Sequence, residues 1–372
     1  MSKVINENTR AFFEIIRAGL WEKKGQLAHF KSIDFREVYR LAEEQSVIGL
    51  AAAGLEHIVD VKAPKEVSLR FVGHALQLEQ RNSAMNQFIE QIVDKMRRED
   101  IYALLVKGQG IAQCYERPLW RTPGDVDFYL SGINYMKAKN FLTPLAQKIE
   151  PEDKKRLHLG MMINSWIVEL HGTLHTGISK RINNISDEVH YDIFYRGNVR
   201  SWSNNGVTVF LPSPNNDVIV VFNHFITHFY GEGVGLRQIC DWCRLLWKFN
   251  GQIDYALLEK RLKRMRLMDE WNVFGSFAVN YLGMPAEIMP FYENNSKNKR
   301  KAQLLAGLII ESGNFGSNKD NSYRGNVPKL RELSITLIRR MGEFGRISFI
   351  FPVNSLRFFL SYLFYRVKAV AL

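Results

Sequence analysis

Cysteine and long apolar runs are both scarce in this chain of 372 residues. Its three cysteines, Cys114, Cys240 and Cys243, are too few and too unevenly spaced for a disulfide framework. The chain does not open with a charged segment followed by an apolar one, as a secretory leader does. No stretch approaches the ~20 uninterrupted apolar residues that cross a bilayer. We therefore expect a cytoplasmic protein without a transmembrane segment.

Several common catalytic motifs are absent as well. The sequence has no Gly-x-Ser-x-Gly elbow, no P-loop and no dinucleotide-binding glycine fingerprint, which argues against the commonest hydrolases, kinases and dehydrogenases. Cys240 and Cys243 have C-x-x-C spacing, but no second cysteine pair accompanies them and their context is helical, which argues against zinc. His224 and His228 lie on a predicted helix crowded with phenylalanine, where core packing explains them better than metal binding.

Length and composition predict a folded chain of two or three domains, because 46% of the residues are hydrophobic. We divide the chain into a helical N-terminal region (1–99), a core with strands (100–212), a helical domain that completes the site (213–295) and a basic helical C-terminal region (296–372). Apolar residues recur every three to four positions after Pro64 and predict a long helix up to the charged run at 97–100.

The positive charge of the chain is concentrated at its C-terminal end. Residues 296–372 contain 14 lysine and arginine residues against four acidic ones, a net charge of +10 out of +12 for the whole chain. Two interpretations remain open. Segments such as 356–360, which mix arginine with phenylalanine and leucine, would suit RNA, a membrane surface or an acidic partner. Alternatively, this region is a helical cap whose aromatic side chains pack inward while its cations stay in water.

The segment from 101 to 130 carries the most information. Residues 101–106 are almost all apolar and predict a buried strand that ends in the turn Lys107-Gly108-Gln109-Gly110. A brief helix is expected at 111–116. The turn-prone residues 121–124 then lead into a second strand, 125–130, which alternates charged and apolar residues. Because side chains alternate along a strand, Asp125 and Asp127 should share one face.

A third carboxylate is predicted nearby. Residues 158–162 and 166–171 read as a hairpin around Asn164-Ser165, and on its second strand Ile167, Glu169 and His171 share one face. We expect a helix at 137–148 before this hairpin. Beyond residue 211 we expect four helices, which begin at 212–214 and 235 and then span 254–268 and 270–282, and loops at 294–301 and 312–325.

Three carboxylates that converge are unfavourable to bury unless cations neutralise them. Mg²⁺ prefers carboxylate and phosphate oxygens, and two such ions can clamp the oxygens of a displacement at phosphorus. The turn at Lys107, Gly108 and Gln109 offers a cation and backbone N–H groups to a phosphate. Arg121 offers a planar guanidinium, which can bind a phosphate through two hydrogen bonds. This pattern predicts a site with two Mg²⁺ ions held by Asp125, Asp127 and Glu169.

The same residues carry a resemblance to a known family. The sequence of residues 101–246 resembles the uncharacterised nucleotidyltransferase family within the polymerase-β superfamily, in the motifs Leu105-Val106-Lys107-Gly108, Tyr115, Arg121, Gly124-Asp125-Val126-Asp127-Phe128, Glu169-Leu170-His171 and Leu236-Arg237-Gln238-Ile239-Cys240-Asp241. The resemblance implies an α+β fold with a polymerase-β-like mixed sheet flanked by helices. It also implies a nucleoside triphosphate donor such as ATP, metal-dependent nucleotidyl transfer and release of pyrophosphate.

Some roles have structural alternatives. Glu169 would hold metal or pair with a cation on an exposed sheet face, and His171 would orient a ligand or serve as a structural histidine. Arg237 and Asp241 would reach the donor phosphates and the acceptor, or form an i,i+4 ion pair. The superfamily usually has Gly-Gly or Gly-Ser where this chain has Gly108-Gln109-Gly110. A catalytically inactive nucleotide-binding protein, and an interaction protein acting through its basic tail, are therefore the rival functions. The acceptor is expected to be a small molecule rather than RNA or protein.

Overall fold

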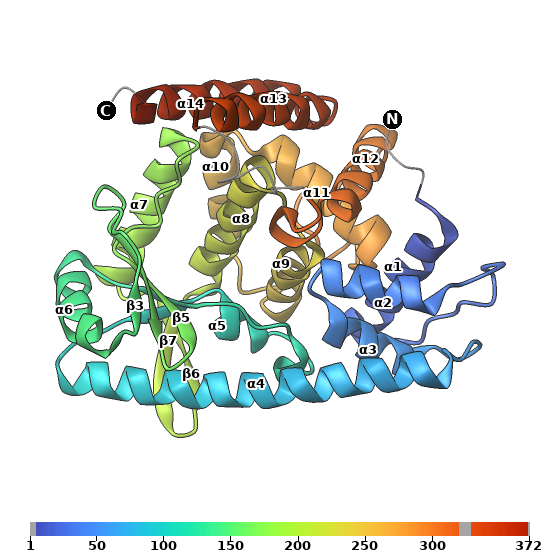
Figure 1. Ribbon diagram of the computed structural model, residues 1–372, viewed down its shortest axis with the longest axis horizontal. Coiled ribbons are helices and arrows are strands. Elements are labelled where there is room, and N and C mark those ends of the chain that lie inside the picture. Colours follow the sequence, from blue (N-terminus) through green and yellow to red (C-terminus); the bar gives the residue numbers. More distant parts are fainter. Residues whose placement is uncertain (1–4, 320–328, 371–372) are drawn as a thin grey trace.

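The computed structural model describes residues 5–319 and 329–370. Within these residues, fourteen α-helices accompany one seven-stranded mixed sheet. Figure 1 shows the sheet at one end of the molecule, the long helix α4 along its base and the remaining helices above and beside them. The α+β architecture expected from the sequence, a mixed sheet flanked by helical regions, is confirmed. In the described part of the chain, no helix combines the length and the apolar character needed to span a membrane.

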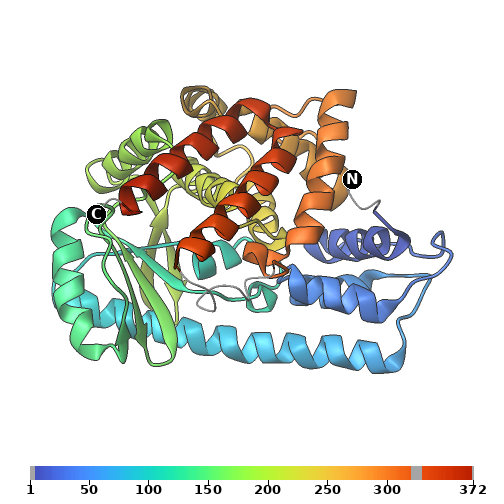
Figure 2. The ribbon, with the colours of Figure 1, turned by 45° about the horizontal axis from the view of Figure 1, so that its top comes forward.

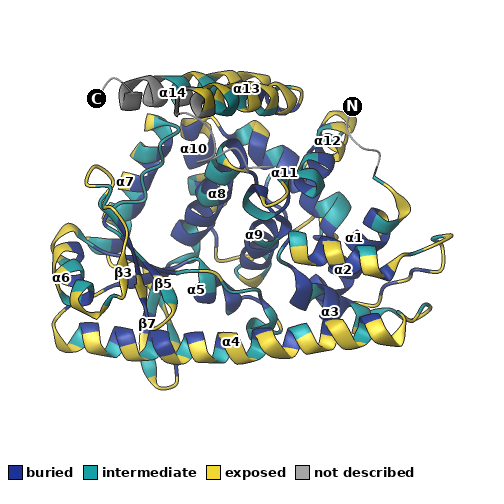
Figure 3. Ribbon diagram, viewed as in Figure 1, coloured by how far each residue is buried: buried dark blue, intermediate teal, exposed yellow. Residues whose placement is uncertain are grey.

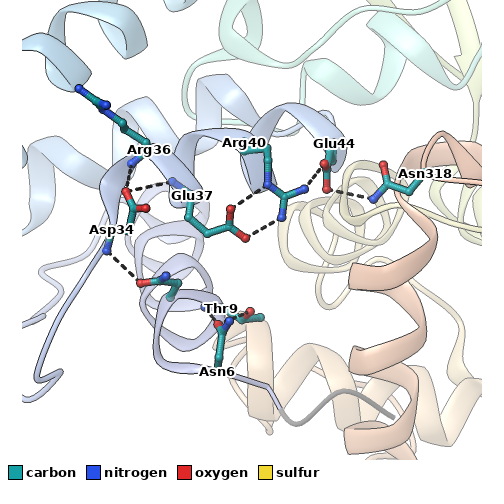
Figure 4. A network of polar contacts seen from close by, with 9 residues as sticks. Asn6, Thr9, Asp34, Arg36, Glu37, Arg40, Glu44 and Asn318 are labelled. Atoms are coloured by element: carbon teal, nitrogen blue, oxygen red, sulfur yellow. Dashed lines mark hydrogen bonds and ion pairs between the residues drawn. The ribbon is translucent and has the colours of Figure 1, made fainter. Parts of the chain in front are cut away.

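The N-terminal region consists of α1 (Glu7–Trp21), α2 (Phe35–Glu44), α3 (Ile48–His57) and α4 (Lys65–Arg98). The side chains of Asn6 and Asp34 accept hydrogen bonds from the first turns of α1 and α2 and so fix where these helices begin. Figure 4 shows these caps and the side chain of Arg40 between Glu37 and Glu44. Glu44 also accepts a hydrogen bond of 2.9 Å from Asn318, which ties a late segment of the chain to α2.

Helix α4 belongs to two hydrophobic cores. Its first half packs against α2 and α3 through Val67, Phe71, Ala75 and Leu78. Its second half packs beneath the sheet through Met85, Phe88, Ile89, Ile92, Val93 and Met96. Figure 3 shows the buried stripe of α4 turned toward the protein and its exposed stripe turned outward. The long helix predicted after Pro64 is therefore confirmed, and its apolar period continues across both cores.

The sheet contains β1 (Leu104–Val106), β2 (Val126–Tyr129), β3 (Lys148–Ile149), β4 (His158–Ile163), β5 (Trp166–His171), β6 (Val199–Asn204) and β7 (Val207–Pro212). The strand order is β3-β4-β5-β2-β1-β7-β6. The pairs β2–β5 and β1–β7 are parallel, and the other neighbours are antiparallel. The predicted hairpin between β4 and β5 is confirmed, and both Asn164 and Ser165 at its turn have the positive φ that a tight hairpin turn requires.

Alternation along β2 and β5 separates the two faces of the sheet. Phe128 and Leu170 are buried against α4 and α6 (Gly132–Leu142). Asp127 and Glu169, one position earlier on each strand, therefore point to the opposite face. Because one face must be apolar to cover α4 and α6, the strand register fixes these carboxylates on the other face.

Helices from the second half of the chain lie over the carboxylate face and beyond it. They are α7 (Lys180–Phe194), α8 (Pro214–Gly231), α9 (Leu236–Lys248), α10 (Tyr255–Met265), α11 (Met268–Leu282), α12 (Ser296–Ser312), α13 (Lys329–Ser348) and α14 (Pro352–Val370). Figure 2 shows α13 and α14 side by side across the top of the molecule. Phe344 of α13, Phe358 of α14 and Phe351 between the two helices are buried, as expected for a helical cap with inward aromatic side chains, whereas Phe349 is exposed.

Some elements differ from the sequence-based prediction. The helix predicted at 137–148 is α6, which begins five residues earlier and is followed by the 3₁₀ turn η2 (Thr143–Leu145). The loop predicted at 294–301 is wrong from Ser296 onward, because the Asn295 side chain caps α12 there and apolar residues of α12 enter the core. The predicted loop at 312–325 contains the 3₁₀ turn η3 (Asn314–Gly316), and residues 320–325 lie outside the described residues.

A close approach between α3 and the segment that leads to β2 can be tested at Gly49. A Cβ atom at Gly49 would lie 1.9 Å from the carbonyl oxygen of Trp120, in the 3₁₀ turn η1 (Pro118–Trp120). We expect Gly49→Ala to lower the free energy of unfolding by about 1–3 kcal/mol, because backbone must move to admit the methyl group.

Gly73→Ala in α4 is the matched control for Gly49→Ala. A Cβ atom there meets no atom within 4 Å, so the substitution should raise stability by up to about 1 kcal/mol through helix propensity. Urea denaturation of both variants measures the contrast. Equal effects in the two variants would contradict the close packing of α3 against η1.

Candidate active site

Three carboxylates meet on the open face of the sheet. Asp127 lies on β2 directly beside Glu169 of the parallel strand β5, and Asp125 immediately precedes β2. One carboxylate oxygen from each of the three residues lies within 4.8 Å of the other two. The structure therefore brings together the three acidic residues that the sequence pattern placed on adjacent strands.

Asp127 is the most deeply buried member of this cluster, with 1% of its surface exposed. Its Oδ1 atom forms an ion pair with Lys107 Nζ at 2.6 Å and accepts a hydrogen bond from His171 Nε2 at 2.8 Å. Its Oδ2 atom is buried and has no partner among the described residues. A buried carboxylate oxygen without a partner is unfavourable, so this atom is suited to meet a bound cation.

Charge within the cluster shifts the protonation of its members. The negative charge of Asp127, together with burial, raises the pKa of Asp125 to about 6. Burial by itself would raise the pKa of Asp127, but Lys107 and His171 outweigh it and lower that pKa. Burial also opposes the charge on Lys107, yet the three carboxylates around it raise its pKa. Lys107 is therefore the internal counterion of the cluster.

The turn after β1 holds Lys107 in place in a strained backbone conformation. Lys107 has φ 59° and Gly108 has φ 39°, both in the left-handed region. A Cβ atom on Gly108 would lie 3.3 Å from the carbonyl oxygen of Asp125, so the absence of a side chain lets the two loops approach closely. The positive φ of Lys107, a residue with a long side chain, is backbone strain of the kind found at functional sites.

The side chain of Gln109 does not line the cavity beside this turn. It is buried, and its Nε2 donates a hydrogen bond of 2.9 Å to Asn82 on α4. Asn82 in turn donates to the carbonyl oxygen of Arg121 at 2.8 Å. Gln109 thus links the turn, α4 and the loop before β2, and any contact of this residue with a ligand rests on its backbone N–H.

Arg121 and Asp241 form a buried two-pronged ion pair. Arg121 Nε and Nη2 donate to the two carboxylate oxygens of Asp241 at 2.8 and 2.7 Å, and the Tyr115 hydroxyl donates to the same carboxylate at 2.8 Å. Asp241 therefore engages Arg121 rather than Arg237, its neighbour one helical turn away. The pair holds the loop before β2 against α9 and aligns Asp125 with the cavity.

Arg237 is a half-buried cation that has no carboxylate partner among residues 5–319 and 329–370. Its Nη1 donates to the carbonyl oxygen of Pro123 at 3.0 Å, and its guanidinium lies 5.6 Å from the ring centroid of Phe315. Burial and the nearby charge of Arg121 lower its pKa. A half-buried guanidinium whose Nε has no partner among the described residues, and which lies beside a cavity, is suited to bind an anion such as phosphate.

A cavity of about 670 Å³ joins these groups. Carboxylates and Lys107 form one wall, and α7, α8, α9 and η3 contribute the others, through Ser186, Val189, Ile219, Val220, Asn223, His224, Thr227, His228, Arg237, Gln238, Asp241 and Phe315. Burial and the charge of Lys107 lower the pKa of His228 to about 4, so this imidazole is neutral at pH 7.

Several polar or aromatic residues of this cavity were not predicted as site residues, among them His158, Phe315 and the pair His224 and His228. His158 had a usable signal, because it opens a predicted strand whose hairpin partner ends in His171. Phe315 had none, because a loop far along the chain delivers it. Cys114, Cys240 and Cys243 are buried free thiols, in agreement with the absence of a disulfide framework.

Comparison with known proteins gives one match. The sequence model of the family described as uncharacterised nucleotidyltransferase matches residues 31–278. This range covers two thirds of the chain, includes α2–α4 before the sheet, and ends within α11. No curated protein and no solved structure matches the chain.

The raised pKa of Asp125 predicts a pH-dependent effect of Asp125→Asn. A carboxyl whose pKa is higher in the folded state favours folding when protonated, and this contribution is lost as the pH rises through the folded value. Without metal, Asp125→Asn should be about 1–3 kcal/mol more stable to urea than the wild type above pH 7, and the difference should vanish as the pH falls from about 6 to about 4. Asp94→Asn on the surface of α4 is the control, because it removes a carboxyl outside the cluster; it should not stabilise the protein above pH 7. A constant difference across this range would refute the shift.

The buried ion pair should be sensitive to loss of one partner. Asp241→Asn leaves the Arg121 guanidinium buried without a counterion and should lower the free energy of unfolding by about 3–5 kcal/mol. Glu66→Gln breaks the ion pair of Glu66 with Arg36. The side chain of Glu66 is 74% exposed and that of Arg36 is 71% exposed, so this variant should lower the free energy of unfolding by less than about 1 kcal/mol. Chemical denaturation at pH 7 compares the two, and a similar loss in both would mean that Asp241 is not the essential counterion.

Proposed function

The chain belongs to the uncharacterised nucleotidyltransferase family, and from this premise we propose that it transfers a nucleoside monophosphate from a nucleoside triphosphate to an acceptor and releases pyrophosphate. The observation that carries the proposal is the buried Asp127, which has one unpaired oxygen beside Asp125 and Glu169 at the wall of the cavity. Such an arrangement suits a cation and a polyphosphate better than any apolar ligand.

The acidic residues fit the metal that this activity implies. Asp125, Asp127 and Glu169 offer oxygen ligands of the kind Mg²⁺ prefers, and the buried Oδ2 of Asp127 has no partner among the described residues. When bound, two Mg²⁺ ions would supply charge neutralisation at the attacking and leaving oxygens. Lys107 would then exchange part of its interaction with Asp127 for one with the substrate phosphates.

The chain's own cations would hold the donor. In this proposal, Arg237 and the turn at Lys107 and Gly108 bind the triphosphate. Arg121 acts from behind them, because Asp241 already engages its guanidinium. The acceptor oxygen forms a bond to the α-phosphorus while the bond from this phosphorus to the β-phosphate oxygen breaks. Glu169 or Asp127 receives the acceptor proton, and pyrophosphate leaves.

The size of the cavity supports a small molecule as acceptor. A volume of about 670 Å³ lies in the range typical of small-molecule sites. The rival proposal, an inactive nucleotide-binding protein, draws on the Gly108-Gln109-Gly110 turn that stands where the superfamily has Gly-Gly or Gly-Ser. An acidic partner for the basic region 296–372 is a further proposal, supported by the net charge of +10 in that region.

Pyrophosphate release separates catalysis from mere nucleotide binding. We expect the protein, Mg²⁺, a nucleoside triphosphate and a cell extract as the source of acceptor to release pyrophosphate and to label one small molecule. Asp125→Asn and Asp127→Asn should each reduce this rate by more than about 100-fold, because they remove proposed metal ligands. The measurement uses each α-³²P-labelled nucleoside triphosphate in turn.

Asp94→Asn, an exposed carboxylate on α4 that pairs with Arg98, should leave the rate unchanged. Nucleotide binding without pyrophosphate release in the wild type, with every nucleotide and extract, would favour the inactive binding protein instead.

A further inference from the structure

Two histidines flank the third carboxylate of the cluster. His158 opens β4 and His171 closes β5, and the antiparallel register sets them directly opposite each other. Their rings lie with centroids 4.8 Å apart, and both reach Glu169. His158 Nε2 is 3.1 Å and His171 Nε2 is 3.4 Å from the same oxygen, Oε2 of Glu169.

These separations suit ligands that share one ion. One ligand atom from each of His158, Glu169 and His171 lies within 4.8 Å of the others. Two ligands placed 2.0–2.2 Å from a tetrahedral or octahedral ion are separated from each other by roughly 2.8–3.6 Å. The two distances to Glu169, 3.1 and 3.4 Å, fall in this range.

The ligand chemistry differs from that of the aspartate pair. Asp125 and Asp127 offer only oxygen, whereas the histidine group offers two imidazole nitrogens and one carboxylate. Imidazole nitrogen favours first-row transition metals over Mg²⁺, and two histidines with one carboxylate leave positions open for a substrate. His171 also touches Asp127, whose Oδ2 is buried and unpaired among the described residues, so the two groups of ligands are contiguous.

We propose that His158, Glu169 and His171 form a site for a divalent transition metal of the Mn²⁺ or Zn²⁺ class, which shares Glu169 with the oxygen ligands of the aspartate pair. The proposal rests on the proposed function for the catalytic use of that metal, but metal binding itself is independent of it. The open positions would face the cavity, where a phosphate of the donor or a hydroxyl of the acceptor can reach them. The alternative is that both histidines only hold Glu169 in place through hydrogen bonds.

Electron paramagnetic resonance of bound Mn²⁺ tests the site directly, because pulsed measurements detect ¹⁴N nuclei coordinated to the ion. We expect the metal-free full-length protein to bind Mn²⁺ with ¹⁴N coupling in the absence of nucleotide. His158→Gln and His171→Gln should each weaken Mn²⁺ binding by at least about 10-fold and diminish the coupling. Melting curves followed by circular dichroism establish that each variant is folded.

His175→Gln is the matched control, because His175 lines the same cavity but its ring forms a hydrogen bond with Asp187. It should bind Mn²⁺ as the wild type does. Mn²⁺ bound without ¹⁴N coupling, or equal binding by folded His158→Gln and His175→Gln, would overturn the proposal.

The two proposals can fail separately. Nitrogen-coupled Mn²⁺ in a protein that releases no pyrophosphate would support this site and reject the transfer reaction. Pyrophosphate release with Mg²⁺ by a protein whose bound Mn²⁺ has no nitrogen ligand would reject this site and support the transfer reaction.

Discussion

The burial of Asp127 is the constraint on which the site depends. Its neighbours Val126 and Phe128 must face α4 and α6, so the alternation of β2 forces the aspartate to the other side of the sheet. A carboxylate with 1% of its surface exposed requires a cation and a hydrogen-bond donor nearby, and Lys107 and His171 supply them. The strained turn at Lys107, where a half-buried amine is held against a buried acid, follows from this requirement.

Around this centre, segments distant in sequence fix the loop that precedes β2. The ion pair of Arg121 with Asp241 attaches the loop to α9, and Asn82 of α4 binds its backbone from the other side. Arg237 of α9 also binds the loop, by donating a hydrogen bond to the carbonyl oxygen of Pro123. Phe315, which lies beyond the residues matched by the family, covers Arg237. The cavity is therefore a product of the whole chain and not of the sheet alone.

Local patterns predicted the centre of the site but not its surroundings. The alternation at 125–130 and 166–171 revealed which side chains share a face, because strand periodicity is a property of neighbours in sequence. The hairpin β6–β7 and helix α7 were missed. Polar residues interrupt the apolar runs of β6, and all of its residues except Asn204 are exposed or half-buried. No local pattern could show that Asp241 pairs with Arg121 instead of Arg237, because the choice of partner depends on where α9 packs. The asparagine- and lysine-rich start of α12 resembled a loop, and its cap and its buried face made it a helix.

The sharing of α4 between two cores has a consequence for synthesis of the chain. Its first half finds partners in helices made earlier, whereas the apolar stripe from Met85 to Met96 faces strands that are made later. The last of these strands, β7, is complete only at residue 212, roughly a hundred residues after α4 ends. During that interval the nascent chain exposes a strip of methionine, isoleucine and phenylalanine, a natural point of contact for chaperones.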